Sequence, residues 1–227
     1  MKNNRLIAVA AVALVCLVAI ALYFSQNSSN PTDLPAGDLT VDTHYRVLGN
    51  PLQVADNGVS VIEFFWYGCP HCRDFEPGIK DWLASAPDDV QFELKPIVWN
   101  EATGLHAAMY YVGVNAERPA VLHEALFDQI IAVRKERELQ KHVNSVGGLF
   151  AEHGVTGVQL ADAINSSAVQ QQVQQAEKDM RQAEVSSTPS VLIGGKYLIL
   201  NNQAVGDKGM FNVMDSLIEM VRQSQVQ

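Results

Sequence analysis

Cysteine and basic side chains are both scarce in this chain of 227 residues. It has three cysteines, and its 16 Lys and Arg residues are outnumbered by 25 Asp and Glu residues, which gives a net charge of −9. A nucleic-acid-binding protein needs a basic surface to neutralise phosphates, so this balance argues against nucleic acid as a partner. Internal repeats are also absent. The length suits one domain with a sizeable core, or one domain that carries an insertion.

Charge is missing from one long stretch near the N-terminus. Lys2 and Arg5 precede residues 6–24, a run of 19 residues without a charged side chain, and a membrane-spanning helix needs about 20. The basic residues before the run place the N-terminus on the inner side of the membrane and the rest of the chain on the outer side. Residues 1–24 are therefore expected to be an anchor or, alternatively, a cleaved signal segment. Residues 25–37 are polar, with two prolines and a glycine, and are expected to form a linker.

Export determines what the three cysteines can do. Cys16 lies inside the apolar run and is expected to behave as a small apolar residue in lipid. Cys69 and Cys72 are left as a pair in the exported body. Disulfides persist outside the cytoplasm, so a close pair there can be chemically active.

A strand–helix–strand unit is predicted around this pair. Residues 59–67 are almost continuously apolar, which is typical of a strand buried on both faces. A helix is expected to begin at Cys69, because Pro70 suits the first helical position, where no N–H is needed. Pro77 lies within that helix. Residues 90–99 are expected to form a second strand, parallel to the first.

The middle and end of the chain have different patterns. Residues 102–184 show helical spacing, with Thr156 and Gln159 as a capping box and Ser166 or Ser167 as a further cap. Residues 190–193 and 196–200 flank Gly194-Gly195, which is a strong hairpin signal. An amphipathic helix is expected after it. The whole pattern is α/β, with a helical block between the two parts of the sheet.

The Cys69-Pro70-His71-Cys72 motif at the start of a helix predicts redox chemistry. Free N–H groups and the macrodipole at a helix N-terminus favour an anion, so the pKa of Cys69 should be lowered. His71 is expected to add a donor or a positive charge beside the same sulfur. A more stable thiolate makes the disulfide more oxidising, so the motif predicts a donor of disulfides, with Cys72 as the resolving thiol.

Two simpler interpretations of the cysteine pair remain open at this point. The pair could form a short-range structural disulfide. It could also bind a metal together with His71, although there is no second cysteine pair to complete a tetrahedral set.

Glu63 interrupts a strand that otherwise looks dry. A buried, unpaired carboxylate is unfavourable, so Glu63 is a candidate for proton handling at the resolving thiol, with its pKa raised by desolvation. Alternatively, Glu63 reaches water at a strand end or pairs with a lysine, and Lys95 in the next strand is a candidate partner.

Thr188-Pro189 directly precedes the predicted hairpin, and an X-Pro bond at such a position can be cis. The histidines outside the motif form no recognisable arrangement and are expected to be surface or core residues; they are His44, His106, His123, His142 and His153.

These residues resemble the active-site region of the bacterial periplasmic DsbA family. The resemblance extends over most of residues 40–223 and includes Lys95, Thr188-Pro189 and the hairpin. Its most specific segment is Glu63-Phe64-Phe65-Trp66-Tyr67-Gly68-Cys69-Pro70-His71-Cys72.

The resemblance implies a thioredoxin fold with an inserted helical domain, made of residues 38–101 and 185–227 with 102–184 inserted. It implies a redox-active Cys69–Cys72 disulfide with an exposed first cysteine. Glu63 and Lys95 are implied to lie beneath the cysteines, and Thr188, a cis Pro189 and Pro70 to contact substrate.

The implied partners are unfolded exported proteins and a quinone-linked, DsbB-like membrane protein that restores the disulfide. The protein is expected to be a monomer without a cofactor, in the periplasm, tethered by residues 6–24 if they are not cleaved. Two alternatives stay open: a disulfide isomerase or reductant of the same fold, and a non-catalytic chaperone or metal-binding module.

Overall fold

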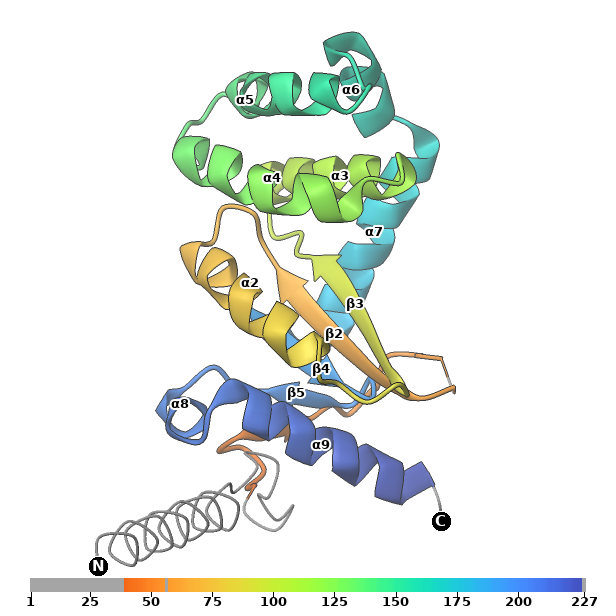
Figure 1. Cartoon of the computed structure of the whole chain (residues 1–227), viewed down its shortest axis with the longest axis vertical. Coiled ribbons are helices and arrows are strands. Elements are labelled where there is room, and N and C mark those ends of the chain that lie inside the picture. Colours follow the sequence, from red (N-terminus) through yellow and green to blue (C-terminus); the bar gives the residue numbers. More distant parts are fainter. Residues whose placement is uncertain (1–38, 56, 226–227) are drawn as a thin grey trace, which may run out of the picture. The chain divides into compact units, whose positions relative to one another are not determined.

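A five-stranded mixed sheet positions the cysteine motif (Figure 1). The computed structural model describes residues 39–225 apart from residue 56. The strands follow the order β1-β5-β4-β2-β3, with only β2 and β3 parallel among these pairs. Their bounds are β1 Tyr45–Val47, β2 Val59–Phe65, β3 Val90–Pro96, β4 Ser190–Ile193 and β5 Tyr197–Ile199.

The predicted strand–helix–strand unit is confirmed. All seven residues of β2 are buried, because the strand has a hydrogen-bonded neighbour on each side and packed side chains on each face. Helix α2, Pro70–Leu83, starts with Pro70 at its first turn and continues through Pro77. Strand β3 ends at Pro96, three residues before the predicted end. Proline has no N–H to donate to a ladder, which explains this boundary.

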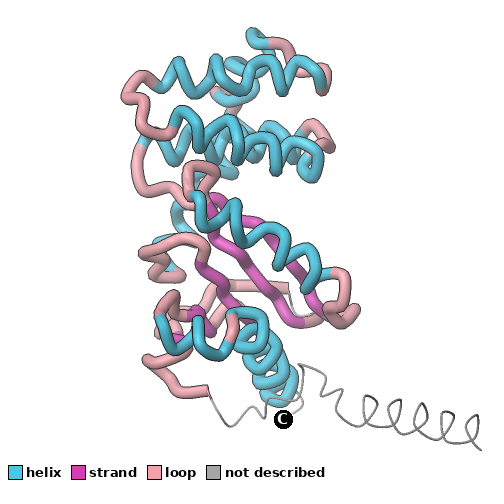
Figure 2. Tube along the Cα trace, turned by 60° about the vertical axis from the view of Figure 1, so that its left-hand side comes forward, coloured by secondary structure: helices cyan, strands magenta, loops and turns pink. Residues whose placement is uncertain are grey.

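The predicted helical middle is also confirmed. Two layers of helices stack beyond the end of β2 that leads into α2, with α3 and α4 nearest the sheet and α5 and α6 above them (Figures 1 and 2). Helix α7 runs from these layers to the level of the sheet (Figure 1). The bounds are α3 Glu101–Asn115, α4 Pro119–Val133, α5 Leu139–Glu152, α6 Gly157–Ile164 and α7 Ser167–Gln182.

Two of these helices begin at the predicted caps. Thr156 and Gln159 form the capping box of α6. The Ser166 side chain accepts a hydrogen bond from the Val169 N–H at the start of α7. Both caps satisfy N–H groups that have no partner within the helix.

The hairpin turn explains the two glycines between β4 and β5. Gly194 and Gly195 have φ values of 58° and 65°, in the left-handed region that favours glycine, and the Lys196 N–H donates to the Ile193 carbonyl at 3.1 Å across the turn. Helices α8, Gln203–Lys208, and α9, Met210–Gln225, follow. The final helix was expected, whereas α8 and the short edge strand β1 were not.

Alternation along β2 divides the core between the two faces of the sheet. Val61 packs in a cluster with residues of α2 and α9. Ile62 and Phe64 point the other way and pack with Met180 near the end of α7. A third cluster fills the helical layers and reaches Phe65 and both cysteines. The cysteine motif therefore lies where the sheet and the helical layers share a core.

Leu39–Gln227 form one compact unit, and the boundaries predicted for an inserted domain at 102–184 stay a prediction. Within the described part of the chain, none of the helices has the length and apolar character needed to cross a bilayer. The predicted anchor or signal at residues 1–24, the linker at 25–37 and Cys16 lie outside the described residues.

Candidate active site

The β2–α2 loop places the two cysteines at the start of α2. Cys69 is the N-cap residue, with an extended backbone (φ −94°, ψ 112°). Its N–H donates to the Trp66 carbonyl at 2.9 Å, and its own carbonyl accepts from the Arg73 N–H at 3.2 Å. Cys69 is 8% exposed and Cys72 is fully buried. Cys69 is therefore less exposed than the resemblance implies, but it is the more exposed residue of the pair.

The Cys69 thiol is strongly acidic. Its pKa is lowered to about 5, chiefly by a hydrogen bond from the Cys72 side chain, against the opposing effect of burial. The Thr188 side chain and the backbone N–H groups of Cys72 and His71 lower it further. The Cys69 thiol can also donate to the Thr188 carbonyl at 3.4 Å. That contact requires the protonated form, so it competes with the groups that stabilise the thiolate.

Cys72 behaves in the opposite way. Donation of its S–H to Cys69 and its burial raise the pKa of Cys72 well above the ordinary range. Both thiols are free in this structure. The reduced pair is thus an anion at the helix start beside a neutral thiol one turn inside, which is the asymmetry that the sequence predicts.

His71 acts differently from the prediction. Its side chain is exposed, and His71 lowers the pKa of Cys69 through its backbone N–H, as a smaller contribution beside that of the Cys72 side chain. The sequence argument expected the imidazole to add to the effect of the helix start. Because the helix start already directs backbone N–H groups at the sulfur, the acidity of Cys69 does not require the ring.

One of the predicted substrate-contact residues, Thr188, contacts the sulfur of Cys69. The Thr188–Pro189 peptide bond is cis, as expected. Thr188 is half-buried and its carbonyl contacts Cys69, whereas Pro189 is buried and Pro70 is exposed. The loop before β4 and the start of α2 therefore meet at the reactive sulfur.

Glu63 is fully buried in the middle of β2. Neither of its carboxyl oxygens has a hydrogen-bond partner among the residues that the structure describes. Burial and, to a smaller extent, the nearby Glu76 raise the pKa of Glu63 well above its ordinary value. The alternatives in which Glu63 reaches water or pairs with a lysine are therefore wrong.

Lys95 does not lie with Glu63, so that expectation is also wrong. Parallel pairing aligns Glu63 with Leu94 and Phe64 with Lys95, and side chains alternate along a strand. Glu63 and Lys95 consequently point to opposite faces of the sheet. Lys95 Nζ donates to Asp179 of α7 at 2.6 Å and lies 3.2 Å from Glu93.

Replacement of Glu63 by glutamine is expected to stabilise the protein at neutral pH. The unfolded carboxyl ionises near its ordinary value of 4.5, whereas the folded one stays protonated because its pKa is raised. Stability is therefore lost as the pH rises above 4.5, at up to about 1.4 kcal/mol per unit, until the folded pKa is reached. Glutamine has the same shape and no such loss.

Denaturant unfolding of both proteins between pH 4 and 8 measures this difference. The advantage of Glu63→Gln should be small at pH 4 and should grow with pH. Glu152→Gln, at an exposed glutamate of α5, is the matched control and should show no such trend. A constant or shrinking advantage would mean that Glu63 is ionised in the folded protein.

Sequence reasoning missed two buried hydrogen-bonded chains beside the motif. In one, Tyr67 Oη lies 2.9 Å from His123 Nδ1, and His123 Nε2 lies 3.0 Å from Glu76 Oε1. In the other, Trp66 contacts His106, which contacts His142. His106, His123 and His142 are core residues, as expected, and so is His44. The partners are 36 to 56 residues apart, so no local pattern links them.

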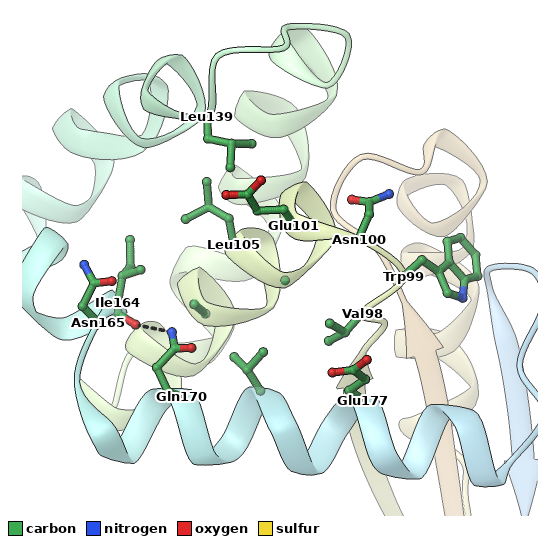
Figure 3. A pocket seen from close by; sticks show the side chains of 13 residues that line it. Val98, Trp99, Asn100, Glu101, Leu105, Leu139, Ile164, Asn165, Gln170 and Glu177 are labelled. Carbon is green, nitrogen blue, oxygen red and sulfur yellow. Dashed lines mark hydrogen bonds between the residues drawn. The ribbon is translucent and has the colours of Figure 1, made fainter.

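A hollow of about 480 Å³ lies among the helical layers (Figure 3). Its lining includes Leu105, Leu139, Ile164, Gln170 and Glu177, and Gln170 donates to the Ile164 carbonyl at 2.7 Å across its edge. None of the predicted site residues lines it. Across the described residues, no group of three or more His, Cys, Asp or Glu side chains is arranged to hold a metal ion.

Comparison with known proteins places this geometry in a family. Residues 46–209 match a protein family described as Thioredoxin. The chain is 30% identical over 193 residues to the thiol:disulfide interchange protein DsbA of Azotobacter vinelandii, which covers 85% of this chain and 89% of that protein. It is 31% identical over 227 residues to DsbA of Bordetella parapertussis, covering 96% and 97%.

Solved structures agree with the sequence relatives. The crystal structure of Pseudomonas aeruginosa DsbA matches with a TM-score of 0.73 at 28% identity, covering 86% of this chain and all of that one. The oxidoreductase NmDsbA1 of N. meningitidis matches with a TM-score of 0.68 at 25% identity, covering 86% and 100%. The chain therefore belongs to the DsbA family of thioredoxin-fold proteins and is a thiol:disulfide oxidoreductase.

Proposed function

We propose that the exchange runs in the oxidising direction, so that the Cys69–Cys72 disulfide is passed to exported proteins that are still unfolded. The observation that carries the proposal is the asymmetry of the reduced pair: Cys69 has a pKa of about 5, and Cys72 is a buried neutral thiol. A reduced form that is stabilised in this way gives up electrons reluctantly, and its disulfide accepts them readily.

The size of the effect follows from the pKa. At pH 7 a thiol with a pKa of about 5 is ionised to within about 1%, and each unit between pKa and pH is worth about 1.4 kcal/mol. Two units give about 3 kcal/mol in favour of the reduced form. For a two-electron couple this corresponds to roughly 60 mV towards a more oxidising potential.

A low pKa helps Cys69 as a leaving group more than as an attacking group. Nucleophilicity falls with pKa, with a Brønsted coefficient of about 0.4–0.5. At pH 7 this reduction almost cancels the gain in thiolate fraction over an ordinary thiol of pKa ~8.5. The stabilised thiolate still departs faster from a mixed disulfide. The geometry therefore favours release of an oxidised substrate over attack on an existing disulfide.

The proposed reaction has two exchange steps. A substrate thiolate attacks Cys69 Sγ, the Cys69–Cys72 bond breaks, and Cys72 leaves with the electron pair and takes up a proton. A second substrate thiolate then attacks the substrate sulfur of the mixed disulfide, and Cys69 leaves as a thiolate. The substrate has lost two electrons and the cysteine pair has gained them.

The surrounding residues are assigned roles within this scheme. Protonated Glu63, buried in the same core, is proposed to handle the proton of Cys72. Thr188, Pro189 and Pro70 are proposed to contact the extended substrate beside Cys69, by backbone pairing along the loop before β4. Lys95 is left out of the chemistry, because it faces α7 and pairs with Asp179.

The cellular setting belongs to the same proposal. An oxidant of this kind requires a compartment where disulfides persist, which supports the periplasm. The reduced pair must then be reoxidised, and a quinone-linked, DsbB-like membrane protein is the proposed electron acceptor. The protein is proposed to work as a monomer.

Equilibration of the protein with glutathione buffers at pH 7 tests the direction. We expect a potential at least about 60 mV above the −270 mV of thioredoxin, together with faster oxidation of a reduced, unfolded substrate by the disulfide form. The Cys69→Ser variant should form no Cys69–Cys72 disulfide in the glutathione buffers and should not oxidise the substrate. A potential near that of thioredoxin would instead support a reductant, and faster refolding of a scrambled than of a reduced substrate would support an isomerase.

A further inference from the structure

We infer that His106 and His142 are positioning residues for the redox site: through the Trp66 indole they fix the loop that carries Cys69. Trp66 Nε1 donates to His106 Nδ1 at 2.9 Å, and His106 Nε2 lies 2.8 Å from His142 Nδ1. His142 Nε2 lies 3.0 Å from the Glu136 carbonyl oxygen. The inference rests on the thiol–disulfide chemistry proposed above and extends it to residues outside the cysteine motif.

The donor and the acceptor of each hydrogen bond from Trp66 through His106 and His142 to Glu136 can be assigned. An indole N–H can only donate, so His106 Nδ1 must accept and the proton of this ring must be on Nε2. His106 Nε2 then donates to His142 Nδ1, and His142 Nε2 donates to the Glu136 carbonyl. Both rings are neutral in this arrangement. Burial, with a contribution from His142, lowers the pKa of His106 to about 3, which agrees with a neutral ring.

The hydrogen-bonded series from Trp66 to His142 crosses both helical layers. His106 belongs to α3, in the layer nearest the sheet, and His142 belongs to α5, in the layer above (Figure 1). The Trp66 and His106 rings are nearly coplanar, with an interplanar angle of 16°, and so are the two imidazoles, with an angle of 21°. These edge-to-edge hydrogen bonds between coplanar rings align the indole with one side chain from each layer.

Trp66 transmits this orientation to the cysteines. A Cβ on Gly68 would lie 2.2–2.8 Å from three atoms of the indole, so the ring lies directly against the loop one residue before Cys69. The Trp66 carbonyl accepts the Cys69 N–H at 2.9 Å. A backbone hydrogen bond of Trp66 also affects the pKa of Cys72. A displaced indole would therefore move groups that set the acidity of the pair.

Packing alone does not explain two imidazoles at these positions. His106 is 1% exposed and His142 is fully buried. An apolar side chain would fill the same space without the cost of burying ring nitrogens. A fully satisfied buried network, in contrast, specifies one arrangement of its members. Fixing the loop is the property that apolar residues would not supply.

The experiment compares His106→Leu with two other variants of the protein, His106→Gln and His44→Leu. Leucine leaves the Trp66 N–H and His142 Nδ1 without a partner, whereas His106→Gln can accept from one and donate to the other. His44→Leu is the matched control, because His44 is also buried and accepts from a backbone N–H, that of Thr40, at 3.0 Å, but belongs to the segment before β1. The readouts are the pKa of Cys69, from thiolate absorbance, and the equilibrium constant with glutathione.

We expect His106→Leu to raise the pKa of Cys69 and to shift the equilibrium constant about tenfold towards the disulfide, equal to roughly 30 mV. His106→Gln should restore most of this change, and His44→Leu should lower the melting temperature without it. If His106→Leu fails to fold, Trp66→Phe removes the same N–H and should shift both readouts. Unchanged values in the folded variants would overturn the inference.

The experiment distinguishes failure of the proposed oxidising role from failure of the inference about the two histidines. An ordinary pKa for Cys69 in the unsubstituted protein would remove the oxidising role, but the indole N–H resonance of Trp66 still reports on the chain. That resonance should move in His106→Leu and His142→Leu and stay in His44→Leu. If the resonance moves in neither His106→Leu nor His142→Leu, the two histidines do not hold Trp66 in place.

Discussion

Alanine in place of Cys72 is expected to abolish turnover and to raise the pKa of the remaining Cys69 thiol from about 5. The side chain of Cys72 is the largest cause of that low pKa. A hydrogen bond to a charged group contributes about 1.5–3 kcal/mol, equal to roughly one to two pKa units. Turnover is lost because the chain no longer has a second sulfur to form or break the disulfide.

Cys72→Ser is the control that separates these two effects. Serine keeps a hydroxyl donor at the position of the thiol, so turnover should be lost while the pKa of Cys69 stays close to 5. Thiolate absorbance between pH 3 and 9 measures the pKa, and the pH dependence of alkylation measures it independently. A pKa near 5 in the alanine variant would show that the backbone N–H groups of His71 and Cys72 stabilise the anion without the side chain.

This comparison also tests how the sequence was interpreted. A Cys-x-x-Cys at a helix start predicts an acidic first thiol from the helix N-terminus and the imidazole of His71. The structure gives the acidic thiol but a different main cause, the S–H of Cys72. The motif still predicts the low pKa of Cys69 correctly. The first turn of the helix places both the Cys72 side chain and the backbone N–H groups around the sulfur of Cys69.

Features with a local cause were predictable from the sequence. The buried strand before the motif, Pro70 at the start of α2, the caps at Thr156 and Ser166, and the glycine turn each depend on a few adjacent residues. Strand β1 has three residues and gains its stability from pairing with β5. Nothing within its own sequence marks it as a strand.

Features that depend on register or on distant contacts were not predictable. The expected pairing of Lys95 with Glu63 fails by one residue of register, because Lys95 aligns with Phe64 and so faces α7. The site is likewise bordered by His106, His123 and Glu76, whose partners come from the β2–α2 loop and from other helices. Only the packing of the helical layers onto the β2–α2 loop brings these side chains together.

The reduced protein is expected to gain stability over the oxidised protein as the pH rises from 5 to 7. The folded-state pKa of Cys69 is lowered from 9.0 to about 5. Its stabilising effect is therefore complete only above the unfolded value and is lost as the pH falls through 5. Because each pKa unit is worth about 1.4 kcal/mol, the contribution is roughly 3 kcal/mol at pH 7 and less than about 0.5 kcal/mol at pH 5.

Urea unfolding of the two redox forms at pH 5, 6 and 7 measures this change. The stability difference, reduced minus oxidised, should increase by about 2 kcal/mol across that range. Its absolute value is offset by the disulfide, which restricts the unfolded chain even for a short loop. Other titrating groups are present in both redox forms, so their contributions to the pH dependence of stability cancel to first order in the difference. The Cys69→Ser, Cys72→Ser double variant should show one stability, whatever the redox buffer.

The same difference must appear in the redox equilibrium, because folding and oxidation form a closed thermodynamic cycle. Whatever free energy the folded protein gives to the reduced pair, relative to the unfolded chain, makes the folded disulfide more oxidising by the same amount. An increase of about 2 kcal/mol therefore requires the potential of the folded pair to rise, relative to that of the unfolded chain, by roughly 40–50 mV between pH 5 and pH 7. A stability difference that does not change with pH would mean that Cys69 is not the thiolate on which the oxidising role depends.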